Sequence, residues 1–401
     1  MIWFILLLWA AVLATDKYIY QNVICARFRH LPMRIVYVIF AILTDAGALG
    51  VPLLRGFGSG DPASGMHLMM WCIWIFFLAA IPKLLFAVGA FLDYLVRKMS
   101  GRRIGFFRIV SLLVGLVVVV SMVVGATSGR SRIRVSRVEL ISDRLPEAFD
   151  GMRIAQFSDL HAGGLIRPEQ QIRALVDTIA SLKPDLVAQT GDMVTLRAEE
   201  LSGEMQSMLS EMAAPMGVYA VFGNHDLGFY LADTVKFPPE REIALLRSKL
   251  EAMGWHLLED ESVLLVKDGD TLLLTGLNFP RDYRYHWADG ETPGVDIDKA
   301  YAGCPDFFNI VLSHTPKLWP TIRSQGRGDL TLSGHVHSMQ MKFDVFGKLW
   351  SPAQWLYDHW SGLYEEDGRW LYVNDGIGCV MYPMRIGARP EVTLIELKRC
   401  E

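Results

Sequence analysis

Five short stretches in the second half of the chain carry the side chains that could do chemistry. In chain order they are Asp159-Leu160-His161, Gly191-Asp192, Gly223-Asn224-His225-Asp226, Ser313-His314 and Gly334-His335-Val336-His337. Together they supply carboxylates, imidazoles and one amide, which is a donor set for two neighbouring metal ions that share a carboxylate. Two such cations, about 3.5–4 Å apart, can clamp a phosphate and generate the hydroxide that attacks it. The pattern therefore predicts a metal-dependent phosphoesterase.

The types of donor narrow the choice of metal. Oxygen and imidazole donors without a thiolate suit Mn, Fe, Zn or Co better than Cu(I), and they do not single out one of these. Asp159 and His161 are two residues apart, so an extended segment places both on one face, and the same holds for His335 and His337. Asp192 is best placed to bridge two ions because one carboxylate has two oxygens. We therefore expect two divalent metal ions as cofactors.

Apolar segments that read as strands precede all five stretches. They are 152–157 before Asp159, 185–190 before Asp192, 217–222 before Asn224, 308–313 before His314 and 329–333 before His335. Ligands of α/β sheets bind at the carboxyl ends of the strands, so five strand ends would direct these donors to one rim. Glycines at positions 191, 223 and 334 allow a sharp turn and a close approach there.

The same alternation predicts the fold class. Helices are predicted at 168–182, 199–212 and 241–253, and further strands at 262–267, 271–276, 371–374 and 392–397. The first of these helices has its apolar residues on one face, as a helix that packs on a sheet requires. Strands alternating with helices, followed by more strands, predict an α/β fold of two packed mixed sheets flanked by helices.

The ordered stretches resemble the calcineurin-like metallophosphoesterase family. The resemblance rests on Asp159-x-His161, Gly191-Asp192, Gly223-Asn224-His225-Asp226, His314 and Gly334-His335-x-His337, and it covers residues 152–397. The tail, from 371 to 394, looks like the membrane-associated bacterial branch of that family. The resemblance implies a two-sheet α/β sandwich of the metallophosphoesterase type.

The resemblance also implies a role for each residue. One metal would be held by Asp159, His161, Asp192 and His337, and the second by Asp192, Asn224, His314 and His335. His225 would lie near the leaving group as an acid or phosphate stabiliser, with Asp226 orienting it. The branch often follows its last histidine with Gly-Gly-Gln, whereas this chain has Ser338-Met339-Gln340, a departure that affects the pocket wall and not the ligands.

Each stretch alone has a simpler explanation. An isolated His-x-His is more often structural than metal-binding, and Gly-Asn-His-Asp could be a turn closed by an Asx hydrogen bond. Five such stretches in order, all at strand ends, favour the two-metal interpretation. His256, His286 and His359 lie outside them and are expected to be surface or packing residues, and Asp375 to lie in a turn.

The first part of the chain has a different composition. The 401-residue sequence is 51% hydrophobic, and long apolar segments occur at 2–14, 35–54, 68–96 and 109–126. A spanning helix needs about 20 mostly apolar residues. We expect a transmembrane region at 1–130 with about four helices, a linker and first strand at 131–150, and the catalytic domain at 151–401.

Two details of that region are open. The third segment is long and contains Pro82 and Lys83, so it is expected to be interrupted there, to cross once and to continue along the interface. The first lacks a positive residue before its apolar run, which favours a retained helix over a cleaved signal peptide. Asp45, inside the second segment, is expected to face the bundle interior and to bond to a neighbour such as Thr44.

Basic residues set the predicted orientation in a bacterial inner membrane. The loops after the first and third segments are rich in lysine and arginine, whereas 56–66 has neither. By the positive-inside rule the basic loops are cytoplasmic, which places the catalytic domain outside. Arg130, Arg132, Arg134 and Arg137, directly after the fourth segment, favour the opposite orientation.

Composition also limits the partners. The net charge of −4 gives no basic field for nucleic acid, so none is expected. The expected partners are the lipid bilayer and a phosphoester substrate that could be lipid-linked, because aromatic residues that suit a membrane interface cluster after residue 282. They are Tyr283, Tyr285, Trp287, Trp350, Trp355, Tyr357, Trp360 and Tyr364, and half or more could simply pack the core. Arg281, Arg284 and Arg385 could pair with phosphate.

Three functions fit these residues. The first is a membrane-anchored hydrolase of phosphomono- or diesters, including lipid or cell-envelope phosphates. The second is a pyrophosphatase that acts on a nucleotide-linked lipid precursor such as UDP-diacylglucosamine, with its site facing the cytoplasm. The third is a binding or scaffold module without catalysis, against which the complete ligand set argues.

Overall fold

The computed structural model describes residues 2–27, 31–54, 62–102, 104–231, 234–280 and 294–400. The chain forms two compact units. The helical unit comprises Met1–Thr127 with Met381–Met384, and the catalytic unit comprises Ser128–Val380 with Arg385–Glu401. Arg281, Tyr283, Arg284, Tyr285, His286 and Trp287, which the sequence singled out, lie outside the described residues.

Each of the four apolar segments lies in a helix of the first unit. The helices are α1 (Ile2–Ile19), α3 (Leu31–Leu54), α4 (Pro62–Ser100) and α5 (Phe106–Val124), with the short elements η1 (Tyr20–Ile24), α2 (Cys25–Arg27) and η2 (Gly125–Gly129). Among the described residues, two stretches are long and apolar enough to cross a membrane, Gly65–Ser100 and Phe106–Gly129. The predicted interruption of the third segment is wrong, because α4 continues through Pro82 as one helix. Pro82 lies against Gly115 of α5, where an added Cβ would be 3.4 Å from the Cβ of Pro82, an ordinary packing distance.

Buried polar groups connect three helices of this unit. The ammonium group of Lys83 (α4) lies 2.9 Å from Asp16 Oδ1 (α1) and donates to Thr44 Oγ1 (α3) at 3.3 Å. Tyr37 (α3) donates to Asp16 Oδ1 at 2.6 Å. Asp45 is buried as predicted, but the hydroxyl of Thr44 bonds Lys83 and backbone carbonyls instead, and Asp45 Oδ1 has no hydrogen-bond partner among the described residues.

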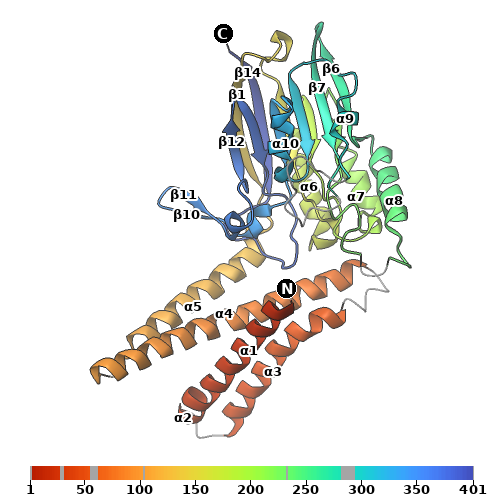
Figure 1. Ribbon diagram of the computed structural model, residues 1–401. Helices are drawn as coiled ribbons and strands as arrows, with labels where there is room; N and C mark the ends of the chain where they lie inside the picture. Colours follow the sequence, from red (N-terminus) through yellow and green to blue (C-terminus); the bar gives the residue numbers. More distant parts are fainter. Residues whose placement is uncertain are drawn as a thin grey trace. The chain divides into compact units, whose positions relative to one another are not determined.

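The catalytic unit contains two six-stranded mixed sheets, as predicted (Figure 1). The first has the order β1 (Arg134–Ser142), β14 (Glu391–Arg399), β2 (Arg153–Phe157), β3 (Leu186–Gln189), β4 (Val218–Ala220), β5 (His256–Leu257). The second has the order β12 (Gly362–Glu366), β13 (Arg369–Val373), β9 (Leu330–Ser333), β8 (Asn309–Ser313), β7 (Asp270–Leu277), β6 (Glu261–Lys267). Strands β2 to β5 run parallel to one another, as do β7, β8, β9 and β13.

The central strands are apolar because both of their faces are covered. Every residue of β3, β8 and β9 is buried, which is the pattern of parallel strands that lie between two layers. Ile154, Leu186, Leu274, Ile310 and Ile395 belong to one buried cluster contributed by both sheets. The two sheets therefore share a core, and their strand ends are held in fixed relation.

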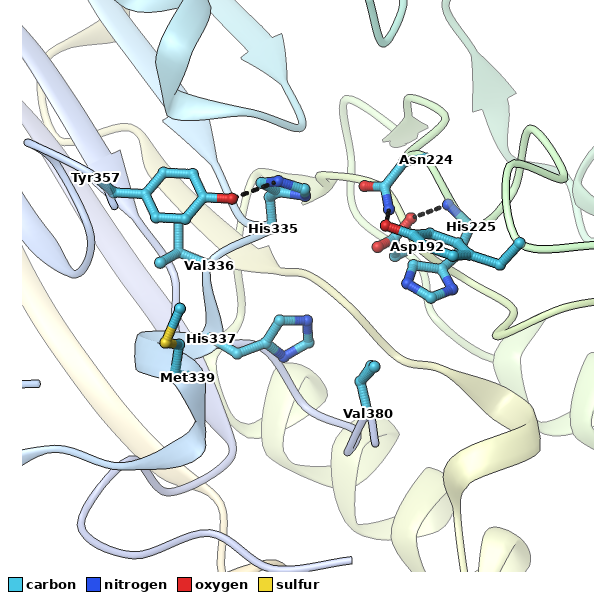
Figure 2. Close-up of a pocket in the computed structure, with 10 residues that line it drawn as sticks. Asp192, Asn224, His225, His335, Val336, His337, Met339, Tyr357 and Val380 are labelled. Atoms are coloured by element: carbon cyan, nitrogen blue, oxygen red, sulfur yellow. Dashed lines mark hydrogen bonds between the residues drawn. The ribbon is translucent and has the colours of Figure 1, made fainter. Parts of the chain in front are cut away.

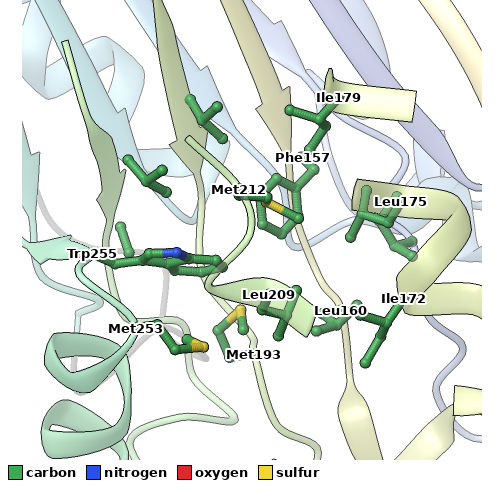
Figure 3. Close-up of a cluster of buried hydrophobic side chains, with 14 of the residues drawn as sticks. Phe157, Leu160, Ile172, Leu175, Ile179, Met193, Leu209, Met212, Met253 and Trp255 are labelled. Carbon is green, nitrogen blue, oxygen red and sulfur yellow. The ribbon is translucent and has the colours of Figure 1, made fainter. Parts of the chain in front are cut away.

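Helices cover the outer faces. On the first sheet lie α6 (Pro168–Leu182), α7 (Gly203–Leu209) and α8 (Pro239–Ala252), whose apolar residues join a second cluster (Figure 3). In that cluster Phe157 and Trp255 meet edge to face, with ring centroids 6.0 Å apart. The predicted helix at 199–212 is shorter, because Ser202 caps α7 by accepting the N–H of Met205. The helices α9 (Ile297–Ala300) and α10 (Trp319–Ser324) contribute to the clusters on the second sheet.

Several elements were not predicted. A hairpin of β10 (Phe343–Val345) and β11 (Lys348–Trp350) projects from the body of the catalytic unit (Figure 1). Single 3-10 turns lie at η3 (Glu147–Phe149), η4 (Ala162–Gly164), η5 (Ala198–Glu200), η6 (Pro316–Leu318), η7 (His337–Gln340) and η8 (Pro352–Trp355). All five cysteines are free, so Cys304 and Cys379, a possible pair from the sequence, are not joined.

Candidate metal centre

The carboxyl ends of five strands bring the predicted side chains together. The segments that follow β2, β3 and β4 of one sheet meet those that follow β8 and β9 of the other. Three groups have potential ligand atoms within 4.8 Å of one another: Asp159, His161 and His337; His161, Asp192 and His225; and Asp192, His314 and His335. The closest approaches include His337 Nε2 to Asp159 Oδ1 at 3.0 Å and His314 Nε2 to Asp192 Oδ2 at 3.1 Å.

The backbone is strained where it presents these side chains. Positive φ angles occur at Asp159 (53°), His161 (45°), Asp192 (57°), His335 (70°) and His337 (51°). Residues other than glycine adopt this conformation at a cost, and such strain gathers at functional sites, where the surrounding structure imposes it. Five of the eight nearby donors are thus held by the fold in a conformation that local preference alone would not select.

Glycines beside the donors leave the space that the donors occupy. A Cβ on Gly223 would lie 2.1 Å from Asp192 Oδ1, and a Cβ on Gly334 would lie 1.9 Å from Ser158 Oγ and 2.4 Å from Asp159 Oδ2. No side chain fits at these distances. The Gly-Asp, Gly-Asn-His and Gly-His patterns therefore reflect close packing of the backbone against the carboxylates.

The donor set fits two divalent cations. Asn224 Oδ1 is buried without a hydrogen-bond partner among the described residues, a costly state unless a ligand completes it, and His314 Nε2 faces Asp192 Oδ2 at 3.1 Å. The Nε2 atoms of His161 and His337 face each other at 3.2 Å. Unless one ring is charged, only one of these two nitrogens can carry a proton in this contact. Two divalent cations, one held by His161 and His337 and the other by Asn224 and His314, would satisfy these atoms. His/Asp clusters of this composition are compatible with a dinuclear divalent centre.

Backbone carbonyls orient two of the rings. His314 Nδ1 lies 2.6 Å from the carbonyl oxygen of Thr190, and His225 Nδ1 lies 2.6 Å from that of Thr195. A carbonyl accepts only from an N–H, so each Nδ1 carries a proton and each Nε2 faces the centre. Both rings therefore turn Nε2 towards the cluster of donors.

The electrostatics favour a bound cation. Burial raises the pKa of Asp192, but His314 and His225 outweigh this effect and hold the pKa well below its usual range. Burial lowers the pKa of His314, but Asp192 and Asp159 outweigh it and raise that pKa to about 9. Burial, and then the charge of His314, lower the pKa of His335 to about 3. Asp192 is therefore held ionised beside His314, and a bound cation would supply the positive charge that His314 supplies here.

Asp226 has a different role from the one predicted. Its Oδ2 accepts the N–H groups of Asp192 at 2.7 Å and Gly223 at 2.9 Å, and its Oδ1 accepts that of Val194 at 3.1 Å. It does not orient the ring of His225, whose partner is the Thr195 carbonyl. Burial, and then Asp192, raise the pKa of Asp226 to about 7. Asp226 therefore organises the loops that carry the donors.

A pocket of about 220 Å³ opens onto the centre (Figure 2). Two tyrosines that sequence reasoning did not assign to the site line it. Tyr230 stacks on His225 with centroids 4.2 Å apart, and its hydroxyl accepts from Asn224 Nδ2 at 3.2 Å, which leaves Asn224 Oδ1 for a metal. The Tyr357 hydroxyl lies 3.0 Å from His335 Nε2. Val336, Met339 and Val380 form an apolar part of the wall.

Two other expectations about charged residues are wrong. Arg385, proposed to pair with phosphate, is fully buried and donates to the carbonyls of Gly378 and Ala388 at 2.8 and 3.1 Å. Asp375, expected in a simple turn, is buried and bonds Lys342, so it is part of an ionic network. Burial cannot be read from residue type, which is why both were missed.

Two histidines outside the motifs pack as expected: His256 stacks on Tyr219, and His359 meets Trp319 edge to face.

Two family models match the chain. Residues 152–339 match the description "Calcineurin-like phosphoesterase", and residues 1–130 match "Probable Calcineurin-like phosphoesterase, transmembrane domain". The chain is a calcineurin-like phosphoesterase. The family predicted from the motifs is thus confirmed. The predicted class of enzyme, a membrane-associated metallophosphoesterase that hydrolyses phosphoester bonds, is confirmed as well.

Relatives occur in bacteria and in vertebrates. The chain is 27% identical to the uncharacterized metallophosphoesterase YkuE of Bacillus subtilis, over 64% of this chain and 82% of the relative. It is 29% identical to a transmembrane protein with metallophosphoesterase domain of Danio rerio, over 71% of this chain and 62% of the relative, so it spans less than two thirds of that protein. It is 26% identical to UDP-2,3-diacylglucosamine pyrophosphatase LpxG of Chlamydia muridarum, over 59% of this chain and 81% of the relative.

Proposed function

We propose that this phosphoesterase uses two divalent ions to hydrolyse phosphomono- or diesters of lipids or of the cell envelope. Asp159, His161, Asp192 and His337 would hold one ion, and Asp192, Asn224, His314 and His335 the other. The observation that carries the proposal is the pocket, in which polar donors and an apolar wall line the same space. A phosphate attached to an apolar group matches both.

The residues around the centre supply the remaining chemistry. Bound divalent ions would neutralise phosphate oxygens and acidify water. His225, held by the Thr195 carbonyl, would keep a proton at Nε2 and deliver it to the departing oxygen. The backbone N–H of His225 donates to Asp192 Oδ1 at 2.9 Å, so the same turn that places the acid also steadies the shared ligand (Figure 2).

Replacing the shared ligand tests this proposal. Asp192→Asn should remove both metals and abolish turnover, because neutralising one carboxylate weakens both sites. Metal content of the purified full chain would be measured together with hydrolysis of a nitrophenyl phosphodiester in added Mn, followed by a screen of lipid and nucleotide phosphoesters. Normal metal content with normal turnover in the variant would exclude Asp192 as the bridge. A metal-replete wild-type protein inert towards every phosphoester would favour a scaffold.

A second candidate is a pyrophosphatase that acts on a nucleotide-linked lipid precursor such as UDP-diacylglucosamine. It is supported by the similarity to a relative that carries this activity in its name, at 26% identity. The same metals would serve. This substrate requires a site on the cytoplasmic side, whereas the loop charges favour the outer side of a bacterial inner membrane. A reporter fused after Glu401, active on only one side of the membrane, separates the two candidates.

A further inference from the structure

The hairpin beside the pocket exposes apolar side chains instead of burying them. Residues 343–356, here called the apolar hairpin, contain β10, β11 and η8. Exposed fractions reach 102% at Phe346, 71% at Trp355, 64% at Leu356 and 53% at Leu349. A two-stranded sheet with no further cover is marginal in water, so this patch needs something to lie against.

Comparison with two other hairpins of the same unit makes Phe346 exceptional. The turns Asp268-Gly269, Asp367-Gly368 and Phe346-Gly347 each join two antiparallel strands through a pair of residues with positive φ. Aspartate tolerates that conformation, and it occupies the first position in two of the turns. A bulky aromatic residue is disfavoured there, and at 102% exposure Phe346 gains nothing from burial within the chain. The position is explained by a contact outside the chain.

The hairpin also lies at the edge of the sandwich that carries the metal centre. It is inserted between Met339 and Tyr357, which both line the pocket. Trp350 meets Phe343 and Trp355 at centroid distances of 5.9 and 5.7 Å, so the aromatic side chains run from the hairpin towards the pocket. The two aspartate turns precede β7 and β13, whose carboxyl ends lie on the side of the centre, so these turns are at the opposite edge.

The polypeptide enters the catalytic unit at that same edge. Strand β1 is parallel to β14 and β14 is antiparallel to β2, so the first residue of β1, Arg134, lies at the edge where β2 delivers Asp159. The apolar stretch that could span a membrane ends at Gly129. The four residues between them extend over at most about 14 Å. The chain therefore enters the catalytic unit at the edge that bears the centre, four residues after a stretch that could span a membrane.

We propose that the apolar hairpin inserts into the surface of the lipid bilayer and holds the pocket against lipid-borne substrates. Aromatic residues flanked by Lys348 suit the interface, where amphipathic rings and a positive charge are both accommodated. The insertion itself does not depend on catalysis. The statement that the substrate comes from the bilayer rests on the proposed function and deepens it.

The test places a reporter at matched turns. The full chain, with its native cysteines replaced by serine, would receive Phe346→Cys or, as control, Asp268→Cys, which is exposed in a turn of the same geometry at the opposite edge. A polarity-sensitive fluorophore on each cysteine would be read in vesicles of phosphatidylethanolamine and phosphatidylglycerol. At position 346 we expect a blue shift and loss of most emission to a quencher on the acyl chains, and at 268 quenching only from water.

Other results overturn the proposal. Equal access of a water-soluble quencher to both positions would show that the hairpin stays in water. A blue shift at 346 that follows the number of protein copies per vesicle, without acyl-chain quenching, would assign the patch to a second copy of this chain. Because neither reading uses turnover, an inactive protein with an inserted hairpin would refute only the proposed function.

A kinetic comparison then tests the link to the substrate. Phe346→Asp should raise KM for a phosphoester carried in vesicles and leave kcat and the hydrolysis of a soluble nitrophenyl phosphodiester unchanged. Asp268→Asn, the control, should change neither. An equal loss on both substrates would indicate a structural defect, and an unchanged KM on vesicles would refute delivery from the bilayer.

Discussion

His225 offers the sharpest test of how the centre works, because its side chain and its backbone have separate tasks. The ring is fixed by the Thr195 carbonyl at 2.6 Å and by stacking on Tyr230, whereas the backbone N–H bonds Asp192 at 2.9 Å. His225→Ala removes the proton donor and keeps the contact to Asp192. General acid catalysis contributes about 10²–10⁴-fold, so the expected loss in kcat corresponds to about 3–5 kcal/mol.

The size of that loss should depend on the leaving group. An alkyl phosphodiester releases an alkoxide that needs a proton, so its kcat should fall by about 10²–10⁴-fold. A nitrophenyl phosphodiester releases an anion that is stable without one and should lose much less. Metal content should stay normal in the variant. Equal losses on both esters with full metal content would make His225 a charge stabiliser, and loss of metal would make it a ligand.

The pH dependence follows from the same proton. The acid form of His225 carries a proton on both ring nitrogens. Burial lowers its pKa, although Asp192 acts in the opposite direction. A lowered pKa means that the proton is lost as pH rises, so kcat on the alkyl ester should fall with rising pH from below the ordinary histidine value. The His225→Ala variant should lack this descending limb, and its persistence would assign the titration to another group.

Three further substitutions test the construction of the protein. Gly223→Ala should lower metal content and activity together, because the new Cβ would lie 2.1 Å from Asp192 Oδ1; a fully loaded, active variant would show that the loop can move aside. Glu200→Ala should lower the free energy of unfolding by about 3 kcal/mol or more, since its carboxylate accepts four backbone N–H groups, two buried and two partly buried, and each buried one left unpaired costs about 1–3 kcal/mol. Thermal unfolding of the metal-free protein would measure this, and Ser202→Ala, which removes only a helix cap, is the milder control. Lys83→Met should destabilise the helical unit by about 3–5 kcal/mol because Asp16 loses its ion-pair partner, and adding Asp16→Asn should restore part of the loss; no rescue would mean that the pair is not coupled.

The sequence predicted the parts of this structure that depend on local pattern. Apolar runs that end in Gly-Asp or Gly-His located the strands, and the rule that ligands gather at strand ends brought Asp159, Asp192 and His335 to one rim. Helix 168–182 agrees with α6 because its apolar spacing is regular and a proline begins it. What these features share is that neighbouring residues determine them.

The features that were missed depend on contacts distant in the sequence. Helix α4 continues through Pro82, which lies against Gly115 of a helix that is distant in the sequence. Asp226 accepts three N–H groups of two loops instead of contacting the ring of His225, and Arg385 donates to buried carbonyls, because buried donors and acceptors must be paired wherever they meet. The sequence did not predict the hairpin at 343–350, because its strands are only three residues long and their apolar residues are not buried.

One buried ionic network connects the turn that follows His337 with the base of the apolar hairpin and with the first residue of β1. Asp375 accepts from Ser338, in the turn that follows His337, at 2.6 Å, and it pairs with Lys342 at the base of the apolar hairpin. Arg134, the first residue of β1, lies 3.4 Å from the same carboxylate and 2.8 Å from Glu391. Separating one partner of a buried ion pair leaves the other charge without compensation, which is costly. The segments that carry Ser338, Lys342 and Arg134 are therefore held in one arrangement around Asp375. One carboxylate thus ties together the start of β1, the base of the hairpin and the turn that carries a predicted ligand, so a change at Asp375 should disturb the pocket and the proposed membrane-binding hairpin together.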